Sequence, residues 1–509
     1  MKGKSLFTNA FWNISANLFS MLILFILAPF LITRLGESQY GMYILLVSVS
    51  SFLGIMNLGL GEATLRYVAF YFGREDLEGV RRVFQATLFV YAISGALSFL
   101  ILFFGAPFLV NLFKLQLAEK NLANSLFKLT AIAFFVRFIS GPIGAVSQGL
   151  LRYDIYSKIN IIENILRIIG SILFILLGFG LSGLMILNII LSLFCLVTNM
   201  VLTKKLVPSI SFLPVTSKSA LKEVFGYGIF AFLSQIFGII WQNADRMILG
   251  ALIGTSAIAF FAVPQDLAFR ALGLAAAGGA VLLPKFSSIH NQDELNKLFT
   301  RSTLIFLILT AIVFVPISVV IKDFLRLWVS PEFASKCGFV GTILAVSCII
   351  RGAFVPNESL FRGIGKPQYY LILVILTSST IIISDLILIP RFGFAGAGYS
   401  FCISPIWGII AVCISWRYIL KNRELMGLVK FFLVPLILCV FSLAIAFFVR
   451  SVFPSEIGWL PLITVAFSTA ILTGIIMGGY EVVAFGKESS VKDIVCRLVN
   501  ETKKHWRFS

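Results

Sequence analysis

Charged residues are scarce in this chain. Asp, Glu, Lys and Arg make up 13% of the 509 residues, roughly half of the share of about 25% that is usual in soluble domains. Acidic residues are the scarcer kind, with 23 against 41 Lys and Arg, so the formal net charge is +18. Because 59% of the residues are apolar, the composition excludes a soluble enzyme, a disordered chain, a secreted disulfide scaffold and a soluble nucleic-acid-binding module.

Motifs for nucleotide, metal and redox chemistry are also missing. The sequence has no G-x-x-x-x-G-K-[ST] stretch for a P-loop and no H-E-x-x-H pair for zinc. The two histidines, His290 and His505, form no metal cluster, and the seven cysteines show no C-x-x-C spacing. We therefore expect no metal ion, no cofactor and no enzymatic activity. Transport by such a chain would be driven by ion gradients, the membrane potential or substrate flux.

Long apolar runs make up most of the sequence. Fourteen runs are long enough to cross a bilayer with about 20 residues each. They lie at about 11–32, 41–61, 84–107, 126–148, 158–179, 182–202, 225–244, 255–283, 302–321, 337–360, 368–389, 395–416, 431–449 and 457–480. Spans of a β-barrel would be about ten residues long and alternate in polarity. The runs therefore predict an all-α polytopic membrane protein.

The distribution of Lys and Arg predicts the orientation of these spans. With the N-terminus in the cytoplasm, 27 Lys and Arg fall on cytoplasmic segments and 10 on the opposite side. Because cytoplasmic loops carry the excess of positive charge, we expect both termini in the cytoplasm. The loops are short, which weighs against membrane glycosyltransferases and polymerases, since these need an extramembrane site.

An internal repeat is visible when the sequence is compared with itself. An offset of 218 aligns Gly36 with Gly254, an offset of 214 aligns Arg137 with Arg351, and an offset of 213 aligns Gly180 with Gly393. The repeat unit has six spans, so both copies have the same orientation. We expect a six-helix lobe at 1–205, a second at 220–420, two further helices at 428–480 and a cytoplasmic tail at 481–509.

Four arginines lie inside the predicted spans, where a charge costs about 2.5–3.5 kcal/mol. They are Arg137, Arg167, Arg270 and Arg351. Such side chains should face a wet cavity or an acidic partner, and Glu163–Arg167 and Asp266–Arg270 have the i,i+4 spacing of helical pairs. Two interpretations stay open. The arginines are either satisfied ion pairs that hold helices together, or the lining of a cavity for an anion such as phosphate.

Other polar residues inside the spans could line the same cavity. The candidates are Asn13, Asn17, Asn164, Gln235 and Gln242. Amides bind sugar hydroxyls, but they also join helices in membranes, so both roles remain open. Glu163, Asp266 and Asp385 are candidates for ion coupling, although Asp385 could equally be an ordinary interfacial carboxylate.

Short motifs lie within the first span and after the first, second and seventh spans. They are Phe11-Trp12-Asn13 with Pro29, Leu35-Gly36-Glu37-Ser38-Gln39-Tyr40-Gly41-Met42-Tyr43, Leu58-Gly59-Leu60-Gly61 with Arg66, and Asp245-Arg246 with Ile248-Leu249-Gly250. With six plus six plus two helices, the chain resembles bacterial polysaccharide flippases of the Wzx type. The wider superfamily has a MATE-like fold and includes multidrug efflux transporters and lipid II flippases.

The resemblance implies a function and partners. It implies translocation of oligosaccharide repeat units on undecaprenyl pyrophosphate from the cytoplasmic to the periplasmic leaflet of the bacterial inner membrane, for O-antigen, capsule or exopolysaccharide synthesis. It implies alternating access through a cationic cavity, with membrane lipids, a polysaccharide polymerase and chain-length machinery as partners and no nucleic acid. The alternatives are a cation-coupled multidrug exporter and a lipid II flippase.

Overall fold

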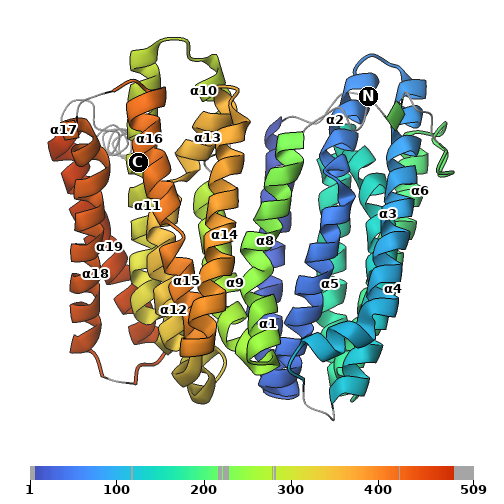
Figure 1. Cartoon of the computed structure of the whole chain (residues 1–509), viewed down its shortest axis with the longest axis horizontal. Coiled ribbons are helices and arrows are strands. Elements are labelled where there is room, and N and C mark those ends of the chain that lie inside the picture. The colour runs from blue at the N-terminus through green and yellow to red at the C-terminus, as the bar shows by residue number, and fades with distance from the viewer. Residues whose placement is uncertain are drawn as a thin grey trace, which may run out of the picture. The chain divides into compact units, whose positions relative to one another are not determined.

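Helices make up most of the residues that the structure, a computed structural model, describes (Figure 1). These are residues 6–115, 119–215, 220–221, 229–277, 279, 282–422, 425–454 and 456–485. The described part contains no strand, and each of the fourteen predicted runs overlaps a helix. The predicted all-α class is therefore confirmed.

Eleven helices in the described ranges are long and apolar enough to cross a membrane. The chain is accordingly a multi-pass membrane protein. The predicted spans at 225–244 and 255–283 fall on α8 (Ile229–Leu252) and α9 (Thr255–Ala277), which are not among these eleven. The first of the eleven, Phe25–Asn57, covers most of the predicted span at 41–61 and only the end of the one at 11–32. The number of fourteen spans therefore stays a prediction.

Contacts divide the chain into two compact units, Met1–Ala259 and Phe260–Ser509. Besides α8 and the first residues of α9, the first unit contains six helices and one 3-10 turn. They are α1 (Leu6–Leu53), η1 (Gly54–Asn57), α2 (Leu60–Phe72), α3 (Leu77–Leu112), α4 (Lys120–Gly149), α5 (Tyr153–Leu176) and α6 (Gly180–Leu206).

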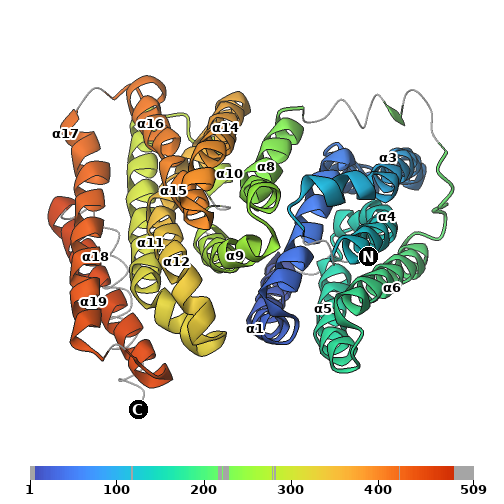
Figure 2. The same ribbon diagram turned by 60° about the horizontal axis from the view of Figure 1, so that its bottom comes forward.

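The second unit contains the remainder of α9 and the helices that follow. They are α10 (Leu282–Ser288), α11 (Gln292–Trp328), α12 (Pro331–Gly352), α13 (Val355–Gly363), α14 (Pro367–Phe392), α15 (Phe394–Ile403), α16 (Ile406–Ile414), η4 (Ser415–Ile419), α17 (Leu425–Leu428), η5 (Val429–Leu433), α18 (Val434–Val452) and α19 (Trp459–Phe485). Helices α18 and α19 pack on α11 (Figure 1 and Figure 2). Arg450 of α18 binds Asp323 of α11 through two contacts of 2.7 and 3.0 Å.

The first two predicted spans are joined differently from expectation. The sequence indicates a loop after residue 32, but helical structure continues through α1 except at Gly36, which has φ 83° and ψ 167°. Glycine adopts this backbone conformation without the steric penalty of a side chain. A bend at one residue therefore replaces the loop.

Helix α4 is the centre of packing in the first unit. It packs against α3 and α6 most extensively, and Figure 2 shows it between them. Its residues Ile143 and Val146 join a buried apolar cluster with Phe84 of α3 and Val68 of α2. Helix α5 packs against α1 and α6. This arrangement brings α4, α5 and α6 together at the middle of their lengths.

Backbone conformation supports the internal repeat. Gly36 and Gly254 both have positive φ, 83° and 131°, and Gly180 and Gly393 have φ of 56° and 63°. These are pairs that the predicted repeat aligns, and each pair lies at a junction between helices. The contacts divide the chain after residue 259, whereas the sequence places the lobe boundary between 205 and 220. The predicted lobe boundaries stay a prediction.

Candidate functional site

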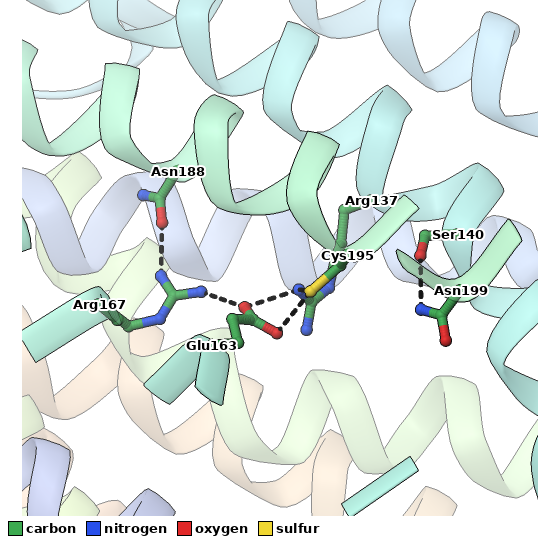
Figure 3. Close-up of polar contacts among 7 residues, drawn as sticks. All are labelled: Arg137, Ser140, Glu163, Arg167, Asn188, Cys195 and Asn199. Atoms are coloured by element: carbon green, nitrogen blue, oxygen red, sulfur yellow. Dashed lines mark hydrogen bonds and ion pairs between the residues drawn. The ribbon is translucent and has the colours of Figure 1, made fainter. Parts of the chain in front are cut away.

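Three charged side chains meet inside the first unit, halfway along their helices. Arg137 extends from α4, and Glu163 and Arg167 extend from α5, one helical turn apart (Figure 3). Glu163 Oε1 accepts from Arg137 Nη1 at 2.7 Å and from Arg167 Nη2 at 2.6 Å. The predicted pair of Glu163 and Arg167 is therefore present. Arg137 finds its acidic partner on another helix.

The three groups differ sharply in exposure. The Glu163 side chain is 3% exposed, whereas those of Arg137 and Arg167 are 48% and 24% exposed. Burying a carboxylate costs free energy unless it is paired and hydrogen-bonded. Here the Glu163 carboxylate is paired with two guanidiniums, which offset this cost. The pairing neutralises one positive charge of two, so the cluster keeps an excess of one positive charge.

Helix α6 completes the cluster with two residues that the sequence reasoning missed. Asn188 Oδ1 accepts from Arg167 Nη1 at 2.5 Å, and the Cys195 thiol donates to Glu163 Oε2 at 3.0 Å. Further along, Asn199 donates to Ser140 of α4 at 3.2 Å (Figure 3). The spacing of polar residues at 188, 192, 195 and 199 places them on one helix face. That stripe is the signal that could have found them.

A charged pair lies where the turn after α4 leads into α5. Arg152 donates to both carboxylate oxygens of Asp154, at 3.0 and 3.2 Å. The hydrogen bond to Asp154 raises the pKa of the Arg152 guanidinium. Arg152 lies just before α5 and Asp154 lies in its first turn, so the pair stabilises the start of this helix.

A cavity of about 530 Å³ opens beside the charged cluster, and we call it the arginine cavity. Its polar lining comes from four helices, α1, α4, α5 and α6: Ser50, Ser51, Thr130, Arg137, Arg167, Asn188 and Ser192. A cavity of this size is typical of sites for small organic ligands. The guanidiniums are the only charged groups among its described lining residues, so the site is suited to an anion.

Arg351, the repeat counterpart of Arg137, has a different environment. It is 8% exposed, and its Nη2 donates to the Phe401 carbonyl at 2.9 Å and to the Ser404 hydroxyl. Its guanidinium lies 3.9 Å from the centre of the Phe401 ring. These contacts favour a structural role in the second unit, and a role of Arg351 in substrate binding stays a prediction.

The other predicted site residues fall in several places. Gln235 lines a separate cavity of the first unit, and Gln242 on α8 is exposed. Asn164, Asp266 and Arg270 are half-buried, whereas Asp385 on α14 is fully buried.

Two predicted residues cannot be placed. The side chains of Asn13 and Asn17 lie outside the described part of the structure. The binding and ion-coupling roles of all these residues, Glu163 included, stay predictions. Within the described ranges, no group of three or more His, Cys, Asp or Glu side chains could hold a metal ion.

Comparisons with known proteins agree on the family and the fold. The sequence profile of the polysaccharide biosynthesis protein family matches residues 33–336. A protein of Shigella flexneri assigned as an O-antigen transporter is 21% identical over 421 residues, which cover 81% of this chain and 98% of that protein.

Two solved structures show the same fold at low sequence identity. The lipid II flippase MurJ in an inward closed conformation has a TM-score of 0.72 and 15% identity, over 92% of this chain and 98% of that chain. An inward-facing multidrug resistance MATE family transporter of the MOP superfamily has a TM-score of 0.62 and 17% identity, over 83% and 97%. The family match, which extends over more than half of the sequence, shows that this chain belongs to the polysaccharide biosynthesis protein family, with the MATE-like fold expected for its flippases.

Proposed function

We propose that this protein is a flippase for oligosaccharides linked to undecaprenyl pyrophosphate, moving them from the cytoplasmic to the periplasmic leaflet of the bacterial inner membrane. The observation that carries the proposal is the arginine cavity, in which Arg137 and Arg167 share a single carboxylate. Both termini lie in the cytoplasm in this proposal. A polysaccharide polymerase and chain-length machinery would consume the translocated units.

The unused donors of Arg137 support binding of a phosphate. An arginine has five N–H donors in a planar fork, and Arg137 uses only Nη1 for Glu163 and Cys195. Among the described residues, no acceptor contacts its Nε or Nη2. With nearly half of the side chain exposed, this edge of the fork can bind a phosphate bidentately.

Glu163 acts in this proposal as the counter-ion of the unloaded site. Its carboxylate accepts from Arg137 Nη1 and from Arg167, and its negative charge opposes a phosphate at the free edge of Arg137. The carboxylate therefore competes with the substrate for the positive charge, which weakens binding and helps release. Because substrate must leave as well as enter, a transport site benefits from such a moderate affinity.

The membrane potential favours the proposed direction. A pyrophosphate diester carries two negative charges, and one charge crossing 100 mV gains about 2.3 kcal/mol. Outward movement from a cell that is negative inside therefore gains roughly 4–5 kcal/mol if both charges cross the full potential.

The test is leaflet-specific detection of lipid-linked oligosaccharide in a strain that lacks the protein. We expect the intermediate to accumulate on the cytoplasmic face, the wild-type gene to restore surface glycan, and the double variant Arg137→Ala/Arg167→Ala to fail. The matched control is Arg81→Ala, because Arg81 is 42% exposed and pairs with Glu78 outside the cavity. It should restore export fully. If the deletion strain held no such intermediate on its cytoplasmic face, the flippase proposal would be wrong.

A further inference from the structure

Two further cavities of the first unit adjoin the arginine cavity. The linking cavity, of about 130 Å³, shares Arg137 with the arginine cavity and is also lined by Glu163 and Asn199. The amide cavity, of about 310 Å³, shares Gly141 and Gln148 with the linking cavity. Because each cavity has lining residues in common with the next, the three lie in a row, a series that starts at the charged cluster and ends at neutral amides.

One face of α4 lines the whole series. Arg137, Gly141 and Gln148 are four and seven residues apart, so they lie on the same side of the helix. The distance along α4 from Arg137 to Gln148 is about 16 Å at 1.5 Å per residue. A Cβ added to Gly141 would lie 3.4 Å from the Tyr91 ring, so any long side chain there would fill the cavity. The missing side chain of Gly141 leaves the space beside the Tyr91 ring free.

The charge of the lining residues changes along this series. Charge is confined to the end with Arg137 and Glu163. The described residues that line the amide cavity carry no charge, and its polar groups include the side-chain amides of Asn57, Gln148 and Gln235. A primary amide both donates and accepts hydrogen bonds, so it complements hydroxyl and acetamido groups. The Gln148 amide has no hydrogen-bond partner among the described residues and remains available.

We propose that the amide cavity is a sugar subsite, which binds the neutral sugars next to the phosphate while the phosphate itself binds at Arg137 and Arg167. The inference rests on the proposed function, and it assigns a position to the glycan part of the substrate. A small inorganic anion would use only the arginine cavity. A cationic drug would find no carboxylate among the described lining residues of the amide cavity. A phosphate-linked sugar chain uses the whole series.

The orientation of the ligand follows from the expected topology. Gln148 lies two residues before the turn that connects α4 to α5, and the Lys and Arg distribution places this turn on the cytoplasmic side. The glycan therefore lies nearer the cytoplasm and the phosphate nearer the middle of the membrane. This is the arrangement expected for a substrate that has just entered from the inner leaflet.

Binding to the purified full-length protein tests the subsite with two probes. One is a short-chain prenyl pyrophosphate, and the other is the same lipid carrying one hexose or one N-acetylhexosamine. The variant is Gln148→Leu, which keeps the side-chain volume and removes the amide. We expect about a tenfold loss of affinity for a sugar-bearing probe and no change for the sugar-free probe. Arg137→Ala should weaken binding of both probes.

The matched control is Gln85→Leu, a half-buried glutamine of α3 outside the three cavities, which should change neither affinity. If the wild-type protein binds the sugar-free probe as tightly as the sugar-bearing probe with either sugar, the subsite is wrong while the phosphate site stands. Equal losses for all probes in Gln148→Leu would also overturn the subsite. Absence of binding to every probe would overturn the subsite and the proposed function together.

Discussion

Arg137 and Arg351 occupy equivalent positions of the internal repeat, yet they have opposite environments. Arg137 is half-exposed in a cavity and binds a carboxylate. Arg351 is buried and binds a backbone carbonyl and a hydroxyl. The same residue type at aligned positions therefore lines a cavity in one unit and makes an internal contact in the other.

A proline explains the difference. Residue 405 in the second unit is Pro, whereas the aligned residue 192 in the first unit is Ser. Pro405 has no N–H, so the carbonyl of Phe401, four residues earlier, loses its helical donor. Helix α15 ends at Ile403, and the Phe401 carbonyl accepts instead from Arg351 and Ser347. In the first unit α6 is unbroken there, and Arg137 is available for other partners.

The largest expected effect is a loss of export in Arg137→Ala, whereas Arg351→Ala should lose stability instead. Arg137→Ala should reduce surface glycan by more than about tenfold, because a charge-assisted hydrogen bond is worth about 1.5–3 kcal/mol, while Arg167 still pairs with Glu163. Arg351→Ala should lower the free energy of unfolding by about 2 kcal/mol and leave export per folded molecule near the wild-type level. Export normalised to protein in the membrane, together with the melting temperature in detergent, checks both. Full export by Arg137→Ala would contradict the comparison.

A smaller effect is expected for Glu163→Gln, which removes the counter-ion of the arginine cavity. Both guanidiniums lose their shared carboxylate, so the affinity for inorganic pyrophosphate should rise about tenfold, on the order of one charged contact. Export should fall because release becomes slow. Isothermal titration at fixed salt measures the affinity. The matched control is Glu78→Gln, which changes an exposed acidic residue of α3 that pairs with Arg81 outside the cavity. Weaker binding in Glu163→Gln would show that Glu163 does not compete with the ligand.

The smallest effect concerns the proline itself. Pro405→Ala should restore a helical donor for the Phe401 carbonyl and make the contact with Arg351 less important. The destabilisation caused by Arg351→Ala should then shrink by about 1 kcal/mol in a double-mutant cycle. Melting temperatures of the wild type, both single variants and the double variant measure this coupling. Strict additivity would exclude the proline as the cause.

Several elements of the site follow from the sequence alone. The four arginines are conspicuous in apolar spans, and the spacing of Glu163 and Arg167 predicts their pairing on one helix face. The all-α class follows from the length and continuity of the apolar runs. These features depend on local sequence, which is why they could be predicted.

The contacts between helices could not be predicted in this way. Arg137 and Glu163 are 26 residues apart, and only the packing of α4 and α5 beside α6 brings them together. The contact of Arg351 with Phe401 spans 50 residues and depends on a helix break at Pro405. The sequence predicts a loop around Gly36 because it indicates that the helix is interrupted there. It does not indicate that the interruption is confined to one residue.

The shared carboxylate of Glu163 has a consequence for how the proposed cycle divides its electrical work. The unloaded cluster carries one excess positive charge, and binding of a doubly negative head group gives one excess negative charge. The loaded step then moves a negative charge outward and the return step moves a positive charge inward, so each gains about 2.3 kcal/mol per 100 mV if the charge crosses the full potential. Without Glu163 the loaded complex would be neutral, and the whole electrical gain would fall on the return step. In the proposed cycle, one buried acid would thus let the membrane voltage drive both halves.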